Sequence, residues 1–279
     1  MEDKLTLKRD FAFTRLFSKK GNESFLIDFL ESILEIKIND IQVIPEARLL
    51  STSESNKFGT LDLKVTTDNG IIINVEMQMQ NTQKIEKRSA FYAGKIMADQ
   101  LKRSQNYNEI NKLVMINILN YNFIDVEEYH NQTVTVLKEH REYEMEIPVT
   151  YHFIELTKFR KAEPDFENKL YQWLSFIDGE NREMVEMAVK KNKEIEKANE
   201  EWEYLTGDEE IKRLEFLELK KCLDDNTIRE AIKEESEKNK SLEIAKKMLE
   251  LNVSLDIILK STGLTEEILN KIKNEIDNR

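Results

Sequence analysis

A three-residue loop, Asp-Asn-Gly at 68–70, constrains this chain more than any other feature because it fixes how two strands pair. It separates two runs rich in β-branched residues, LDLKV and IIINV. Its composition is typical of a hairpin loop in which a type I turn is closed by a glycine in the left-handed region. In that geometry Thr67 faces Ile71. Counting outward along both strands then places Asp62 opposite Glu76.

The hairpin has one apolar face and one polar face because side chains alternate across a sheet. The apolar face, which we expect to pack in a core, carries Leu61, Leu63, Val65, Ile73, Val75 and Met77. The polar face carries Asp62, Lys64, Thr66, Asn74, Glu76, Gln78 and Gln80.

Asp62 and Glu76 would repel each other as directly opposed carboxylates, so their pairing calls for a counter-charge. A divalent metal supplies one. Two carboxylates and a backbone carbonyl form an oxygen-rich site suited to Mg²⁺ or Mn²⁺, which can activate water and polarise a phosphate. The alternative is an ordinary hairpin whose polar face meets solvent and whose carboxylates are neutralised by Lys64.

The order of the remaining elements predicts an α/β fold. Apolar periodicity indicates helices at about 10–18, 23–35 and 81–106, and strands at 41–44, 61–65, 71–75, 112–119, 133–137 and 149–156. After residue 160 only helices are expected, with breaks near Pro164, Asp178-Gly179, Gly207, Asp224-Asp225 and Gly263. We therefore expect a mixed sheet flanked by helices in residues 1–160, a helical extension packing on that core at 161–235, and a C-terminal helical hairpin at 236–279.

Composition limits the kinds of site that this chain can build. Hydrophobic residues make up 40% and charged residues 34% of the 279 positions, which is typical of a folded, helix-rich protein. The charged N-terminus and the lack of a long apolar stretch predict a cytoplasmic protein with no membrane contact. The single cysteine, Cys222, excludes an internal disulfide, and three scattered histidines lack the spacing of a helical zinc site. Any metal must therefore bind to carboxylates.

The net charge of −12 argues against a protein that coats nucleic acid through a broad basic face. The charge is unevenly spread, since residues 1–160 hold 21 Lys or Arg against 24 Asp or Glu. Most of the acidity lies after residue 160, so the first part of the chain can still present a local positive surface.

A serial resemblance adds to this interpretation. The segments DFAFTRLF, LDLKV, INVEMQ, RSAFYAGKIMADQL, KLVMINILNYNF and HFIELTKF resemble, in that order, the Rpn family of recombination-promoting nucleases, also labelled transposases. That family belongs to the PD-(D/E)XK nuclease superfamily, whose signature is a carboxylate on one strand and E-x-K or E-x-Q on the next. The resemblance implies a DNA endonuclease that uses Mg²⁺ or Mn²⁺, with Asp62 and Glu76 as metal ligands and Gln78 in place of the signature lysine.

Gln78 leaves a positive charge missing, because an amide can orient water but brings no cation. Lys64, on the polar face, and Lys57, just before the strand, are the nearest candidates to supply it; both can equally be solvated. Asp10 occupies the position of a D-x-x-F element that recurs in the family. It could help to hold the metal or simply cap the first helix.

The helix after the metal strand carries a candidate DNA contact. Arg88, Tyr92, Lys95 and Asp99 share one helical face, and Gln100 lies beside it. A phosphate-contacting edge and a solvated helix with mixed charges both fit this pattern.

The last two helices superficially suggest a helix-turn-helix. The final helix mixes Glu267, Lys271, Lys273, Glu275 and Asp277, so it lacks the basic face of a DNA-reading helix. We therefore expect these helices to contact a helical partner or to form a homodimer.

Three functions remain open at this stage. The leading hypothesis is a metal-dependent DNA endonuclease that serves recombination, mobile elements or phage defence. The second is a nuclease-like module that binds DNA without cutting it, consistent with the missing lysine. The third is a protein-interaction module, consistent with the acidity of residues 161–279.

Overall fold

The computed structural model describes residues 6–8, 10–45, 63–81, 84–101, 104–207, 239–251 and 253–277, and a few scattered residues between 208 and 238. The chain divides into two compact units, Met1–Ile211 and Lys212–Arg279.

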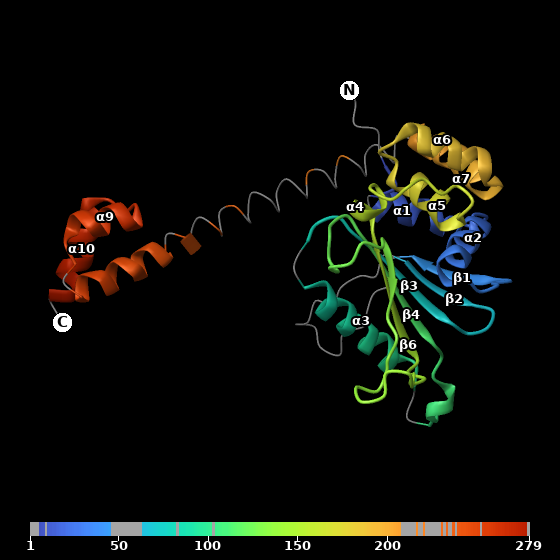
Figure 1. The fold of residues 1–279 in the computed structure, drawn as a ribbon, viewed down its shortest axis with the longest axis horizontal. Coiled ribbons are helices and arrows are strands. Elements are labelled where there is room, and N and C mark those ends of the chain that lie inside the picture. Colours follow the sequence, from blue (N-terminus) through green and yellow to red (C-terminus); the bar gives the residue numbers. More distant parts are fainter. Residues whose placement is uncertain are drawn as a thin grey trace. The chain divides into compact units, whose positions relative to one another are not determined.

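The first unit is built on a six-stranded mixed sheet (Figure 1). Its strands lie in the order β1-β2-β3-β4-β6-β5, with β1–β2, β2–β3 and β5–β6 antiparallel and β3–β4 and β4–β6 parallel. The strand bounds are β1 Ile41–Pro45, β2 Leu63–Thr67, β3 Ile72–Gln78, β4 Leu113–Leu119, β5 His130–Gln132 and β6 Val149–Glu155. The expected α/β class with a mixed sheet is confirmed.

The hairpin of β2 and β3 has the predicted register. Leu63 pairs with Val75, and the Thr67 N–H donates to the Ile71 carbonyl at 3.0 Å. Gly70 closes the turn at φ +79°, in the left-handed region that favours glycine. A Cβ there would also lie 2.9 Å from Oδ1 of the exposed Asn111 side chain, which would have to shift.

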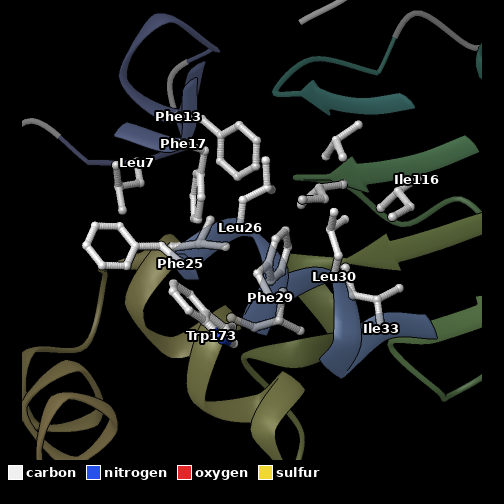
Figure 2. Close-up of a cluster of buried hydrophobic side chains, with 14 of the residues drawn as sticks. Leu7, Phe13, Phe17, Phe25, Leu26, Phe29, Leu30, Ile33, Ile116 and Trp173 are labelled. Atoms are coloured by element: carbon white, nitrogen blue, oxygen red, sulfur yellow. The ribbon is translucent and has the colours of Figure 1, made fainter. Parts of the chain in front are cut away.

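One face of the sheet packs on a large core shared by helices from both ends of the unit. The predicted apolar residues of the hairpin that the structure describes, Leu63, Val65, Ile73, Val75 and Met77, all lie in it. The covering helices include α1 Asp10–Ser18, α2 Glu23–Leu34 and α5 Lys169–Asp178. Four aromatic rings form its centre, with centroid separations of 4.6 to 6.2 Å (Figure 2): Phe13, Phe17, Phe29 and Trp173.

The helices after residue 160 belong to this same core. The short α4 Leu156–Phe159 follows β6 directly, and α6 Arg182–Lys191 and α7 Lys193–Gly207 follow α5. Their buried residues, Ala188, Ile195, Ala198 and Leu205, extend the cluster. The sequence did not predict the break at Asn192, whose side chain accepts from the N–H groups of Glu194 and Ile195 at the start of α7.

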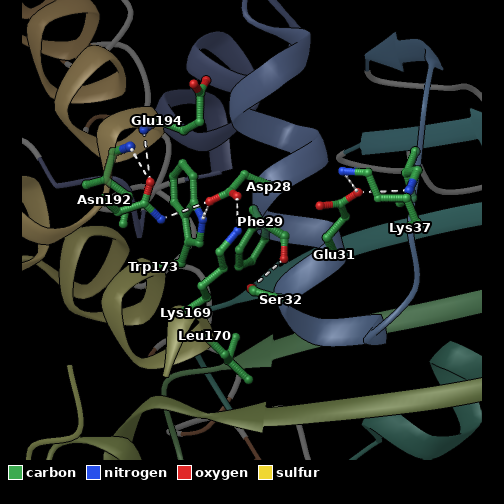
Figure 3. Close-up of polar contacts among 12 residues, drawn as sticks. Asp28, Phe29, Glu31, Ser32, Lys37, Lys169, Leu170, Trp173, Asn192 and Glu194 are labelled. Atoms are coloured by element: carbon green, nitrogen blue, oxygen red, sulfur yellow. Dashed lines mark hydrogen bonds and ion pairs between the residues drawn. The ribbon is translucent and has the colours of Figure 1, made fainter. Parts of the chain in front are cut away.

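A half-buried carboxylate ties three of these helical segments together (Figure 3). Asp28 on α2 accepts hydrogen bonds from Lys169 Nζ at 2.7 Å and from Trp173 Nε1 and Asn192 Nδ2 at 2.9 Å each. Burial raises the pKa of Asp28, but the three donors outweigh burial and hold it below its ordinary value. This cluster therefore serves the packing of the large core.

The opposite face of the sheet is covered by α3, Ile85–Asp99, which connects the parallel strands β3 and β4 (Figure 1). The apolar contacts are fewer here: Tyr92, Ala93 and Ile96 of α3 pack on Ile72, Leu113 and Met115. The helix is shorter than the predicted 81–106, and a 3-10 turn at Tyr107–Glu109 precedes β4.

The predicted strand at 133–137 is wrong. The edge strand β5 lies just before it, and Val136 forms only an isolated bridge with Glu144. β5 pairs with β6 from His130, opposite Ile154, to Gln132, opposite His152. The regular strand pairing ends there, before the predicted segment begins. Val134 is 59% exposed, which shows that β-branched residues alone do not hold a segment in a strand when no layer covers them.

The second unit is helical. Residues 239–250 are helical, followed by α9 Leu255–Thr262 and α10 Glu266–Asp277. Gly263 ends α9 at φ +66°, where the break was predicted. A small core holds the three helices together: Ala245, Ile258, Leu269 and Ile272.

Candidate functional site

Polar side chains lie in a row on the face of the sheet that α3 covers. Glu76 on β3 is only 2% exposed and Asn74 is fully buried, while Gln78 at the end of the strand is partly exposed. The alternative of a polar face that meets solvent is therefore wrong for this part of the hairpin. Burying a carboxylate costs free energy unless hydrogen bonds or an opposite charge compensate for the lost hydration.

Two groups in the described structure compensate Glu76. The Asn74 amide Nδ2 donates to Glu76 Oε1 at 3.1 Å. Arg88 on α3 brings Nη2 to 3.7 Å from Glu76 Oε2, and its guanidinium lies 5.0 Å from the centre of the Tyr92 ring. The Arg88 side chain is 40% exposed, so one cation links the buried carboxylate with the surface.

The polar row continues onto the next strand. Asn117 on β4 pairs in register with Glu76, and its Oδ1 accepts from the buried Ser89 hydroxyl of α3 at 2.9 Å. Its Nδ2 donates to the His152 carbonyl at 3.4 Å. These bonds fix α3, and with it Arg88, over Glu76. Neither Ser89 nor Asn117 was a predicted site residue; the sequence signal for the pair is the asparagine within the apolar run KLVMINIL.

The other predicted catalytic residues are placed only in part. Asp62 and Lys57 lie outside the described residues. The observed hairpin register, continued by one pair beyond Leu63 and Val75, predicts Asp62 opposite Glu76. Asp10 begins α1, but its side chain is outside the description. Lys64 pairs in register with Asn74 and forms no ion pair with any described residue.

The predicted DNA-contacting face of α3 splits into different roles. Arg88 and the buried Tyr92 meet the site, whereas Lys95 pairs with Asp99 at 2.9 Å. Gln100 forms two hydrogen bonds with the backbone of Asn111 and so holds the segment that leads into β4.

The described residues fit an oxygen-liganded cation in part. They contain no group of three or more His, Cys, Asp or Glu that could hold a metal. The described donors at the row are the Glu76 carboxylate and the buried Asn74 Oδ1, which accepts no hydrogen bond from the residues that the structure covers. Hard oxygen donors of this kind suit Mg²⁺ or Mn²⁺, and Asp62 would add the second carboxylate.

Among the helices that the structure describes, none has both the length and the apolar character needed to cross a bilayer.

Comparisons with known proteins agree with this arrangement. Residues 7–235 match a family model described as PD-(D/E)XK nuclease family transposase. Residues 238–274 match a second model, described as the C-terminal HTH domain of the Rpn/YhgA-like nuclease family. Neither the curated proteins nor the solved structures gave a match.

The second match corrects the expectation for the C-terminal helices. The prediction that these helices do not form a helix-turn-helix is wrong, because it depends only on the mixed charge of the last helix. The architecture depends on a turn and on apolar residues at helical intervals. Gly263 supplies the turn, and Ile258, Leu269 and Ile272 supply the packing.

Proposed function

The chain belongs to the PD-(D/E)XK nuclease family of transposases, within the Rpn branch, and from that premise we propose that it is a metal-dependent DNA endonuclease. The observation that carries the proposal is the buried Glu76, held beneath α3 with Arg88 as its cation. A fold that needed only stability would gain nothing from a carboxylate at this position.

Asp62 and Glu76 would hold a divalent cation, Mg²⁺ or Mn²⁺, on the polar row. Such an ion, when bound, lowers the pKa of a bound water and polarises the scissile phosphate. The Asn74 amide fixes Glu76 Oε1, so one carboxylate oxygen is already oriented in the protein alone. Asp10, at the start of α1, is a further candidate to support the metal.

Gln78 would orient the attacking water through its amide, and Arg88 would supply the positive charge that the amide lacks. The guanidinium is permanently charged and can form paired hydrogen bonds with phosphate oxygens. Tyr92 positions it by stacking, and the Ser89–Asn117 bond holds the helix that carries both. Lys64 and Lys57 remain candidates for weaker contacts with the DNA backbone.

DNA is the proposed partner of both units. Lys95 and Gln100 extend the α3 edge, and the helix-turn-helix unit would add a second contact.

We further propose a homodimer through the C-terminal helices, supported by the exposed Ile244, Leu251 and Ile257. Light scattering of the pure protein tests it, since a monomer at micromolar concentration would contradict it. Action in the cytoplasm on recombination, mobile elements or phage DNA fits such an enzyme.

Cleavage of supercoiled plasmid tests the endonuclease directly. We expect nicked and linear DNA with Mg²⁺ or Mn²⁺ and intact plasmid with EDTA. The variants Asp62→Ala and Glu76→Gln should each lose at least about 1,000-fold in rate, as removal of a metal ligand implies. The matched control is Glu142→Gln, which replaces an exposed carboxylate far from the row in sequence and should cut normally. Cleavage by the Asp62→Ala variant at the normal rate would sink the proposal.

A second function is favoured by one observation, the neutral Gln78 in place of a lysine. In that case the protein binds DNA at the same row without cutting it. Binding of a labelled duplex under several divalent metals, with no strand cleavage, would support this alternative. A protein-interaction role predicts no DNA affinity even at low salt, where electrostatic attraction is strongest.

A further inference from the structure

An aromatic pocket opens on the same face of the sheet as the polar row. Its volume is about 450 Å³, within the ~300–1,000 Å³ typical of small-molecule sites. It lies where α3 and β6 meet the segment after β4. Its lining includes Glu86, Ala90, Phe123, Thr133, Tyr151 and Phe153.

The walls of this pocket are aromatic and pre-formed. The rings of Tyr151 and Phe153 lie at 10° to each other with their centroids 6.5 Å apart. The ring centroids of Phe123 and Phe153 are 5.1 Å apart. The buried Glu155 accepts from the Phe123 N–H, and Lys158 binds both Glu155 and the Ile124 carbonyl at 2.6 Å. These charge-assisted bonds hold the Phe123 wall in place without a ligand.

The pocket is aligned with Glu76. Glu76 pairs in register with Asn117, and Asn117 pairs in register with Phe153, so the three side chains form one row across neighbouring strands. Neighbouring strands lie ~4.8 Å apart, which places Phe153 roughly 10 Å from the carboxylate. Helix α3 contributes to both places. Its Arg88 pairs with Glu76, and its Glu86 and Ala90 line the pocket.

We propose that this pocket binds an unstacked nucleobase of the DNA strand whose phosphate lies at Glu76. The inference rests on the proposed function and adds to it that the enzyme engages single-stranded or locally opened DNA. A duplex keeps its bases stacked, so only an unpaired or extruded base reaches an aromatic pocket beside the cleavage position.

The chemistry of the lining fits a base better than a phosphate or a sugar. Aromatic side chains stack on any base, because every base presents a flat π face. Glu86 at the pocket offers a carboxylate that can accept from an exocyclic amino group. The Thr133 hydroxyl accepts from the Tyr151 N–H at 3.0 Å, so its own proton is available to an acceptor on the base. The backbone phosphate would meet Arg88 instead.

An abasic scan tests the pocket without relying on cleavage. The probe is a fluorescein-labelled single strand of about 20 nucleotides, bound by the full-length protein with EDTA and followed by anisotropy. One abasic site is moved through the strand, one position at a time. We expect a single position to weaken binding by about 5- to 150-fold, the range for loss of one stacked base, with little effect elsewhere.

A matched pair of variants on one helix locates the effect. Ala90→Trp fills the pocket from an exposed position of α3, and Ala98→Trp adds the same side chain two turns further along the helix. The first should weaken binding of the intact strand by a similar factor and abolish the dependence on abasic position. The second should leave both unchanged. Circular dichroism of each variant checks that the fold is kept.

The outcomes separate this inference from the proposed function. A protein that neither binds the single strand nor cleaves plasmid with Mg²⁺ contradicts both, whereas one that cleaves plasmid but binds no single strand contradicts the pocket alone. Binding with a flat abasic profile, or an Ala90→Trp variant that binds as before, overturns the pocket alone and leaves the endonuclease standing. If the natural ligand of the pocket is a protein side chain and not a nucleobase, binding should likewise not depend on the position of the abasic site.

Discussion

The two faces of the central sheet differ in what they bury. The face toward α1, α2 and α5 is continuous and apolar, with the four-ring cluster around Phe29 and Trp173 at its centre. The face toward α3 has smaller apolar clusters and, between them, a row of buried polar groups that includes Asn74, Glu76 and Asn117. The first face therefore provides most of the packing, and the second carries the residues that we propose for catalysis.

The difference arises from single positions along one strand. Asn74 and Val75 are neighbours on β3, and both have no exposed surface, but they point to opposite faces. A pleated strand can thus contribute to an apolar layer on one face and to a polar layer, the proposed site, on the other. Substitutions at the two positions should have opposite consequences, which makes the comparison testable.

The largest effect is expected from placing a polar group in the apolar layer. Val75→Asn removes a buried aliphatic side chain and leaves an amide without partners among Leu63, Ile73 and their neighbours. We expect a loss of roughly 3–5 kcal/mol in the free energy of unfolding. Urea denaturation followed by far-UV circular dichroism measures it. A loss below about 1 kcal/mol would show that this layer tolerates polar groups and that the two faces are not distinct.

The next effect concerns activity rather than stability. Arg88→Ala should lower the rate of plasmid cleavage about 100-fold, the scale for loss of one group that stabilises developing charge. Arg88→Lys keeps the charge without the fork and should recover part of the rate. Lys64→Ala is the comparison on the sheet side, and a smaller loss is expected because Lys64 forms no ion pair with the described residues. A greater loss for Lys64→Ala than for Arg88→Ala would reverse the assignment of the cation.

The hairpin was predictable because its determinants are local. The loop at 68–70 sets the register, and the alternation of apolar and polar residues assigns Val75 and Glu76 to opposite faces. The burial of Glu76 was not predictable, since it depends on how α3 packs across the sheet. The role of Arg88 at Glu76 depends on the same packing, and sequence spacing alone placed it on a DNA-contacting edge.

Non-local contacts explain the other gaps between prediction and structure. The Asp28 cluster joins residues more than 140 positions apart, and no sequence pattern marks such a cluster. The segment 133–137 has strand-forming residues, but it forms no strand, because no layer covers it. The helix-turn-helix was set aside on surface charge, although its core residues define the architecture. Asp62, Lys57 and the side chain of Asp10 lie outside the described residues, so their roles stay predictions.

A pH dependence should come from the edge of the apolar layer. His152 and His130 stack there with Nδ1 and Nε2 3.0 Å apart. Burial, followed by the neighbouring His130 and Lys112, lowers the pKa of His152 from 6.5 to about 4. Burial also lowers the pKa of His130.

The sign of that dependence follows from proton uptake by the unfolded chain. Between pH 6.5 and about 4 the unfolded state binds a proton at His152 that the folded state does not. Stability is fully present above pH 6.5 and should fall by on the order of 1 kcal/mol per pH unit below it. Urea denaturation from pH 7.5 to 5 measures the slope. His152→Gln should flatten it, whereas His140→Gln, at an exposed histidine, should not. An unchanged slope in His152→Gln would assign the effect to other groups.

The smallest effect on stability is expected on the reactive face. Asn74→Val removes an amide whose Oδ1 accepts no hydrogen bond from the described residues, and whose Nδ2 donates to Glu76. The gain from burying an aliphatic group and the loss of that donor should nearly cancel, so we expect a change within about 1 kcal/mol of either sign. Cleavage should still fall about tenfold, because Glu76 loses a group that orients it. Measuring unfolding and cleavage on the same preparation tests both halves. A loss of stability as large as that of Val75→Asn would mean that the polar row stabilises the fold as much as the apolar layer does. The two faces would then differ in composition but not in their contribution to stability.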